Sequence, residues 1–104
     1  MDRIEKLKEY LQADENDSFL QHALALEYIK SGNDEEAKKL FNEILKREPG
    51  YIGSYYHLGK LLEQMGDAPE ALKVYERGMK EAKAAEDHHS YNELQAAYED
   101  LEDN

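Results

Sequence analysis

The sequence predicts an all-α fold of stacked antiparallel helix pairs, with about six helices in a single domain over residues 1–104. The first observation is a duplicated passage, in which Gly32-Asn-x-x-Glu-Ala-x-x-x-Phe41 recurs 34 residues later as Gly66-Asp-x-x-Glu-Ala-x-x-x-Tyr75. That period is typical of a repeat made of one helix pair. The second is composition, since threonine and tryptophan are absent and valine occurs once, which disfavours strands.

Each copy of this passage marks the end of one helix and the start of the next. Glycine accepts the left-handed backbone that ends a helix, so Gly32 and Gly66 are expected to terminate helices. Asn33 and Asp67 are then expected to cap the helices that follow. In each copy an alanine and an aromatic residue lie four positions apart on one helix face, so a neighbouring helix can approach closely.

The N-terminal part predicts a short helix followed by a broadly apolar one. A flanking helix is expected over residues 2–12, where Ile4, Leu7 and Leu11 lie three or four positions apart. So short a helix is marginal alone and needs tertiary contacts. After a polar break, the apolar and small residues of a helix over residues 18–31 cover more than half of its circumference, so it must be covered on more than one side.

Three more helices are expected in the middle of the chain. The helix after Gly32 ends at Pro49, because proline disfavours a helical conformation in the residue before it. The next covers residues 52–65 and contains Gly59. A glycine inside a helix costs about 1 kcal/mol relative to alanine, so we expect a packing reason for it. A further helix covers residues 69 to about 84.

The C-terminal part predicts a polar joint over residues 86–90 and a capping segment over residues 90–102, whose helix spans residues 91–101. No lysine or arginine follows Lys83. Acidic residues in the last turn oppose the helix dipole, so we expect this end to fray. The acidic helix could recruit a basic partner segment, or it could serve only as a solvating cap.

These residues resemble the tetratricopeptide repeat, whose pattern is a large aromatic, Leu-Gly and Tyr, followed by Ala, Phe and Pro. The second unit matches it with Tyr55, Leu58, Gly59, Leu62, Ala71 and Tyr75, but has Lys83 in place of proline. The first unit keeps Leu24, Ala25, Tyr28, Ala37, Phe41 and Pro49, but has Gln21 in place of the aromatic. The resemblance implies a right-handed superhelical array, with repeat 1 over residues 18–51 and repeat 2 over residues 52–85. It also places Ala25 and Gly59 where paired helices cross closely.

The resemblance further implies a protein-interaction module, an adaptor or scaffold. In this family the first helix of each pair lines a concave groove that commonly receives an extended peptide or a helix. The residues placed on that face are Phe19, His22, Leu26 and Lys30 from the first repeat, and Tyr56, His57, Lys60 and Glu63 from the second. Phe19, Leu26 and Tyr56 would be apolar anchors, and the lysines would orient the partner by charge.

Two alternatives concern the partner. The same face could be covered by a second copy, giving a homo-dimer or larger homo-oligomer. Chaperone-tail binders of this family carry lysine and asparagine on this face, whereas here His22, Leu26 and His57 occupy the corresponding positions. That difference argues against an acidic chaperone tail as the ligand.

Composition excludes several other classes of function. The formal net charge of −11 makes nucleic acid and anionic membrane surfaces poor partners. Without cysteine there are no disulfides or thiolate ligands. The N-terminus lacks the apolar core of a secretory signal, and no apolar run approaches membrane length, so a cytoplasmic location is expected.

Neither an active site nor a metal or cofactor site is predicted. His88 and His89 diverge by about 100° on a helix, and no His-x-x-x-His pair supports a closed coordination shell. The serines lie near predicted helix ends, and the glycines serve structural roles rather than cradling a phosphate. We therefore expect a protein that is not an enzyme and needs no cofactor.

Overall fold

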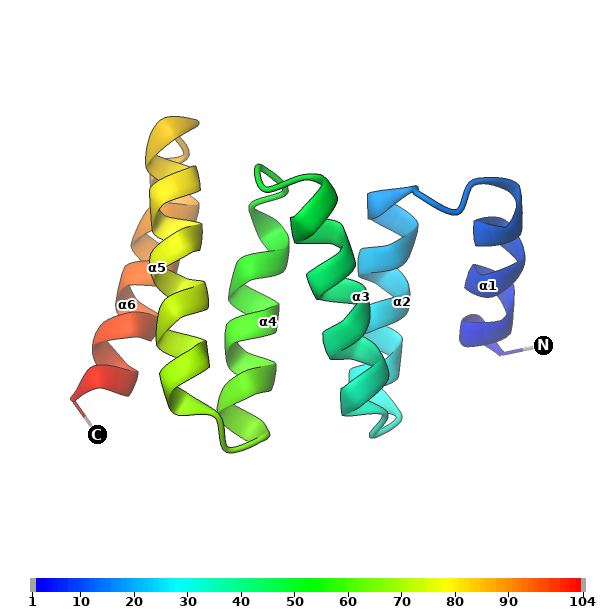
Figure 1. Cartoon of the computed structure of the whole chain (residues 1–104), viewed down its shortest axis with the longest axis horizontal. Coiled ribbons are helices and arrows are strands. Elements are labelled where there is room, and N and C mark those ends of the chain that lie inside the picture. The colour runs from blue at the N-terminus through cyan, green and yellow to red at the C-terminus, as the bar shows by residue number, and fades with distance from the viewer. Residues whose placement is uncertain (1, 104) are drawn as a thin grey trace. The chain divides into compact units, whose positions relative to one another are not determined.

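The computed structural model describes residues 2–103, which contain six α-helices and no strand (Figure 1). The helices are α1 (Arg3–Ala13), α2 (Ser18–Lys30), α3 (Asp34–Arg47), α4 (Gly53–Gln64), α5 (Ala68–Ala84) and α6 (His88–Glu102). The predicted all-α fold of antiparallel helix pairs is thus confirmed. The chain divides into two compact units, one ending at Glu48 and the other beginning at Pro49, close to the predicted boundary between the repeats.

Unit 1 consists of α1, α2 and α3, and α2 packs against both of the others. This arrangement explains why α2 has no single polar face, since it is covered on two sides. The buried hydrophobic side chains of unit 1 are Leu7, Leu24, Ala25, Ala37, Phe41, Ile44 and Leu45.

Unit 2 consists of α4, α5 and α6, in which α5 packs against both α4 and α6. The α4 helix also contacts α6. The buried hydrophobic side chains of unit 2 are Tyr55, Leu58, Leu61, Leu62, Ala71, Val74, Tyr75, Ala82, Leu94 and Ala97.

The close approach of α4 and α5 accounts for Gly59, which is buried in the middle of α4. A Cβ atom built on Gly59 would lie 2.1 Å from Cε1 of Tyr75, closer than any carbon atoms can pack. The expected packing reason for this glycine is therefore confirmed, because the aromatic ring of α5 occupies the space of a side chain.

The same turn connects three pairs of helices. Its left-handed residue is Gly32 between α2 and α3, Gly66 between α4 and α5, and Glu86 between α5 and α6, with φ angles of 80°, 84° and 58°. In each turn the amide of the following residue donates to the carbonyl five positions earlier, as in Asn33 N to Tyr28 O at 2.8 Å. This hydrogen bond is the signature of the Schellman ending of a helix.

Two predictions of helix starts differ from the structure. Asn33 makes no side-chain cap, and its amide nitrogen instead donates to Ser31 Oγ at 3.0 Å. The helix predicted from residue 91 instead begins at His88, since the Asp87 carboxylate accepts the Ser90 amide and caps the helix there. The cap predicted at Asp67 is confirmed by its bond from the Glu70 amide at 3.2 Å.

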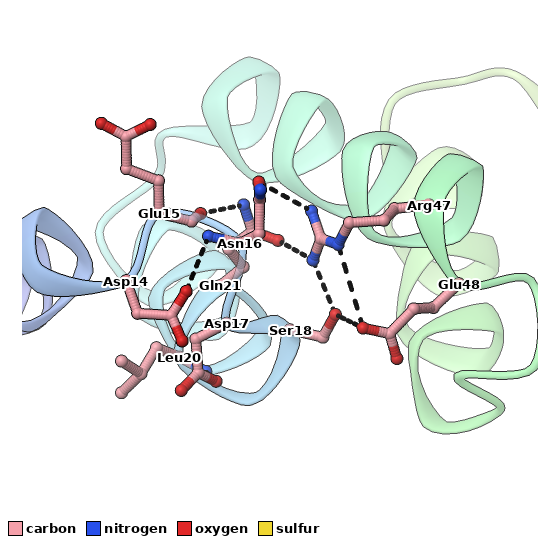
Figure 2. A network of polar contacts seen from close by, with 9 residues as sticks. All are labelled: Asp14, Glu15, Asn16, Asp17, Ser18, Leu20, Gln21, Arg47 and Glu48. Carbon is pink, nitrogen blue, oxygen red and sulfur yellow. Dashed lines mark hydrogen bonds and ion pairs between the residues drawn. The ribbon is translucent and has the colours of Figure 1, made fainter.

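Gln21, which replaces the aromatic of the repeat pattern, is buried and belongs to a part-buried polar network between α2 and α3 (Figure 2). Its Nε2 donates to the Glu15 carbonyl at 3.0 Å, and its Oε1 accepts from Arg47 Nη2 at 2.7 Å. Arg47 also donates to Ser18 Oγ at 2.6 Å, and that hydroxyl donates to Glu48 at 2.7 Å. These hydrogen bonds connect the start of α2 to the end of α3.

Candidate functional site

The predicted face of unit 1 is formed by α2, and Phe19 is its most accessible apolar side chain. Phe19 lies in the first turn of α2 and is 70% exposed, whereas Leu26, two turns later, is half-buried. The His22 ring packs edge-on against the buried Phe41 ring, with 5.5 Å between centroids. His22 therefore supports the core as well as lining this face.

Lys30, the predicted orienting charge of unit 1, belongs to an ion-pair cluster. Its Nζ lies 3.3 Å from Glu27 Oε2, and Nε of Arg3 lies 3.5 Å from the same oxygen. One carboxylate thus faces two cations, and Asp2, which lines the same surface hollow, supplies a second negative charge nearby. The sequence prediction missed Arg3, which α1 brings to this cluster.

The predicted residues of unit 2 form a connected group on α4. Lys60 Nζ lies 5.8 Å from the centroid of the Tyr56 ring, within the range of a cation–π interaction. The same ammonium lies 3.7 Å from Glu63 Oε2. Lys60 is thus held between an aromatic ring and a carboxylate, with about two-fifths of its side chain exposed (42%).

Glu63 is itself held by the core. The hydroxyl of the buried Tyr75, on α5, donates to Glu63 Oε2. Burial raises the pKa of Tyr75 above its ordinary value, and the Glu63 carboxylate raises it further, so this hydroxyl remains a donor at neutral pH. Glu63 therefore positions Lys60 more than it offers a separate contact. Tyr75 was not among the site residues predicted from the sequence. The only signal in the sequence was that Tyr75 occupies the repeat position where the first unit has Phe41, which adds a hydroxyl group.

His57 lies in the same group and is partly buried. Its ring meets the Tyr56 ring edge-on, with 5.8 Å between centroids. Burial lowers the pKa of His57, and the negative charge of Glu93 on α6 partly opposes that shift. An ordinary histidine is already mostly neutral at pH 7, so His57 presents a neutral imidazole there.

Metal sites are recognised by clustered ligand side chains, and ligand-binding or catalytic sites often contain buried polar groups without a hydrogen-bond partner. Residues 2–103 contain no group of three or more histidine or carboxylate side chains placed to hold a metal ion. Every buried side-chain nitrogen and oxygen in this part of the chain has a hydrogen-bond partner. None of the described helices combines the length and the apolar composition needed to cross a bilayer.

Comparison with known proteins gives consistent matches to one family. A family model described as tetratricopeptide repeat matches residues 28–98. The solution structure of a tetratricopeptide repeat domain protein from Salinibacter ruber is 37% identical, with a TM-score of 0.80 over 83% of this chain and 87% of that one. A protein from Bordetella parapertussis is 25% identical, with a TM-score of 0.83 over 97% of this chain and 88% of that one.

A more distant structure shares the fold. The TPR2B domain of yeast Sti1, solved in a complex with pHsp70, is 14% identical and has a TM-score of 0.88 over 96% of this chain and 80% of that one. A comparison of the sequence with curated proteins found no match.

Proposed function

Because the chain belongs to the tetratricopeptide repeat family, whose domains are generally protein-interaction modules and typically non-catalytic, we propose that it is an adaptor that binds a peptide or helix of a partner protein. The surfaces proposed to bind the partner are the α2 face of unit 1 and the α4 face of unit 2. The complex of the yeast Sti1 domain with pHsp70 supports a protein as the kind of partner.

The observation that carries the proposal is the pairing of Tyr56 and Lys60 on α4. An aromatic ring with an ammonium group over it offers apolar area and a positioned charge in one place. Glu63 restrains Lys60, and Tyr75 in turn holds Glu63, which reduces the side-chain ordering that binding requires. Exposed Phe19 adds an apolar anchor on unit 1.

These side chains indicate the chemistry of the partner segment. Tyr56 and Phe19 favour apolar side chains, which lose water when they bind. The Lys60 ammonium favours a single carboxylate beside the apolar group. The neutral imidazole of His57 adds no cation, so a densely acidic tail would find little charge to neutralise here. The proposed ligand is therefore an amphipathic segment with one acidic position.

A pull-down with the tagged protein tests this proposal. Proteins that copurify with the wild type are identified by mass spectrometry, and their recovery is then compared with that of Tyr56→Ala/Lys60→Glu. The double substitution removes the ring and reverses the charge, so we expect recovery of a specific partner to fall about tenfold or more. Far-UV circular dichroism should remain that of the wild type.

Tyr10→Ala/Lys39→Glu is a matched control outside the two proposed faces. Tyr10 is exposed on α1, and Lys39 forms an exposed pair with Glu36 at 3.7 Å, the same spacing as in the Lys60–Glu63 pair. We expect this variant to recover the partner as the wild type does. Equal recovery by both variants would contradict the proposed α4 face.

A further inference from the structure

The cations of unit 2 are concentrated on one helix. Apart from Lys60 on α4, the lysine and arginine residues of this unit all lie on α5. Three of them are spaced by about one helical turn and line one open surface hollow, together with Glu76 and Met79. We call these three residues, Lys73, Arg77 and Lys80, the α5 stripe.

The α5 stripe has one fixed member and two unpaired ones. The Arg77 guanidinium lies 5.7 Å from the centroid of the Tyr55 ring, which is buried and is anchored through its hydroxyl to the Pro49 carbonyl at 2.6 Å. In the part of the chain that the structure describes, neither Lys73 nor Lys80 forms an ion pair. In a chain with a net charge of −11, this group of exposed cations is available to an acidic segment.

The chain itself contains a segment with the complementary charge and spacing. The α6 helix has no lysine or arginine, and it exposes Ala96 and Glu99. Asp103, the exposed residue directly after α6, continues in a helical conformation and extends this face, so the three residues lie three and four positions apart. This α6 face runs from Ala96 to Asp103, and the α5 stripe runs from Lys73 to Lys80, so both span eight residues. The small alanine side chain also allows another helix to approach.

We propose that the α5 stripe of one copy docks the α6 face of a second copy. The contact is heterologous, since it joins two different surfaces, so each copy can engage one neighbour through α5 and another through α6. The net charge of −11 opposes association, so the contact is weak and forms at high protein concentration. It uses no residue of the α2 or α4 faces proposed to bind a partner, so it can be tested separately from that function.

Sedimentation equilibrium of the full chain over a range of concentrations tests the contact by charge reversal. We expect the average mass of the wild type to rise with concentration. Lys73→Glu/Lys80→Glu should weaken the association about tenfold, because it places like charges at the contact. Glu99→Lys/Asp103→Lys should weaken it similarly, whereas an equimolar mixture of the two variants should restore it, since opposite charges face each other again.

The second variant separates this contact from general repulsion. Glu99→Lys/Asp103→Lys makes the net charge less negative, so repulsion alone predicts stronger association, while the proposed contact predicts weaker association. Glu9→Lys/Glu43→Lys changes the net charge equally at exposed positions of unit 1 and should associate at least as well as the wild type. A monomeric wild type at every concentration, undiminished association of the α6 variant, or no restoration in the mixture would each overturn the proposal.

Discussion

At the scale of single residues, Gln21 shows how a repeat tolerates a departure from its pattern. Gln21 and Tyr55 occupy equivalent positions, 34 residues apart, and both donate a hydrogen bond to the carbonyl six positions earlier. The acceptors, Glu15 and Pro49, are equivalent as well. A glutamine amide thus replaces a tyrosine hydroxyl, and Arg47 satisfies the additional acceptor that the amide brings into the core.

Gln21→Leu tests this role. Leucine has a similar size but removes the hydrogen bond to the Glu15 carbonyl and one of the two hydrogen bonds that Arg47 Nη2 donates. Because both hydrogen bonds are part-buried and one involves a charged group, we expect a loss of about 1–3 kcal/mol in the free energy of unfolding, measured with urea. Gln12→Leu, at an exposed position of α1, is the control and should stay within about 0.5 kcal/mol of the wild type. An equally small change for Gln21→Leu would show that the network does not stabilise unit 1.

At the scale of elements, the turn between α5 and α6 explains why the start of the last helix was predicted three residues late. The first two such turns have glycine at the left-handed position, which is a clear sequence signal. The third has Glu86, so the pattern predicted a polar joint instead of the same turn. The hydrogen bonds of the turn form nonetheless, and only the strain at Glu86 differs.

Glu86→Gly should therefore stabilise unit 2. The left-handed conformation costs a residue with a side chain about 1–2 kcal/mol, and the greater freedom of glycine in the unfolded chain offsets part of that gain. We expect the free energy of unfolding to increase by about 0.5–1 kcal/mol. Glu86→Ala removes the same charge but keeps a Cβ atom, so it should give no comparable gain. If alanine stabilises as much as glycine, charge rather than backbone strain is the cause.

The helix pair of unit 2 depends on the absence of a side chain at Gly59. Gly59→Ala would improve helix propensity by about 1 kcal/mol, but the new methyl group would overlap the Tyr75 ring. Since overpacking typically costs about 1–3 kcal/mol, we expect a net loss of stability in urea unfolding. Gly53→Ala on the same helix is the control, because nothing lies within 4 Å of the position that a Cβ atom would take there. A stabilised Gly59→Ala variant would mean that α4 and α5 separate easily.

At the scale of the whole molecule, repeated signals in the sequence predicted more than isolated side chains could. The spacing of 34 residues predicted the four helices of the two repeats and their pairing, because each signal occurs twice in the same context, whereas the first and last helices were predicted from apolar residues three and four positions apart. The resemblance to the repeat family also placed Tyr56 and Lys60 on one face of α4. Their interaction with Glu63 and Tyr75 could not be predicted, since it depends on rotamers and on where α5 packs. That the candidate residues bind a partner, and that the two units act as a single domain, remain predictions.

Net charge gives the prediction that belongs to the molecule as a whole. The chain has 24 acidic and 13 basic side chains, so the folded state concentrates negative charge that the unfolded chain spreads out. In most of its ion pairs at least one of the two side chains is exposed to solvent. Such pairs contribute about 0–1 kcal/mol each to stability. General repulsion should therefore outweigh the local attraction.

Added salt should stabilise the protein for this reason. Raising the ionic strength from about 0.01 M to about 1 M shortens the Debye length from roughly 30 Å to roughly 3 Å, which screens repulsion across the molecule. We expect the midpoint of urea unfolding to rise with sodium chloride concentration, and urea is required because guanidinium chloride is itself a salt. Glu9→Lys/Glu43→Lys, with a less negative net charge, should show a smaller rise. A midpoint that falls as salt is added would mean that the ion pairs and the acidic first turns of the helices stabilise the fold more than the excess charge destabilises it.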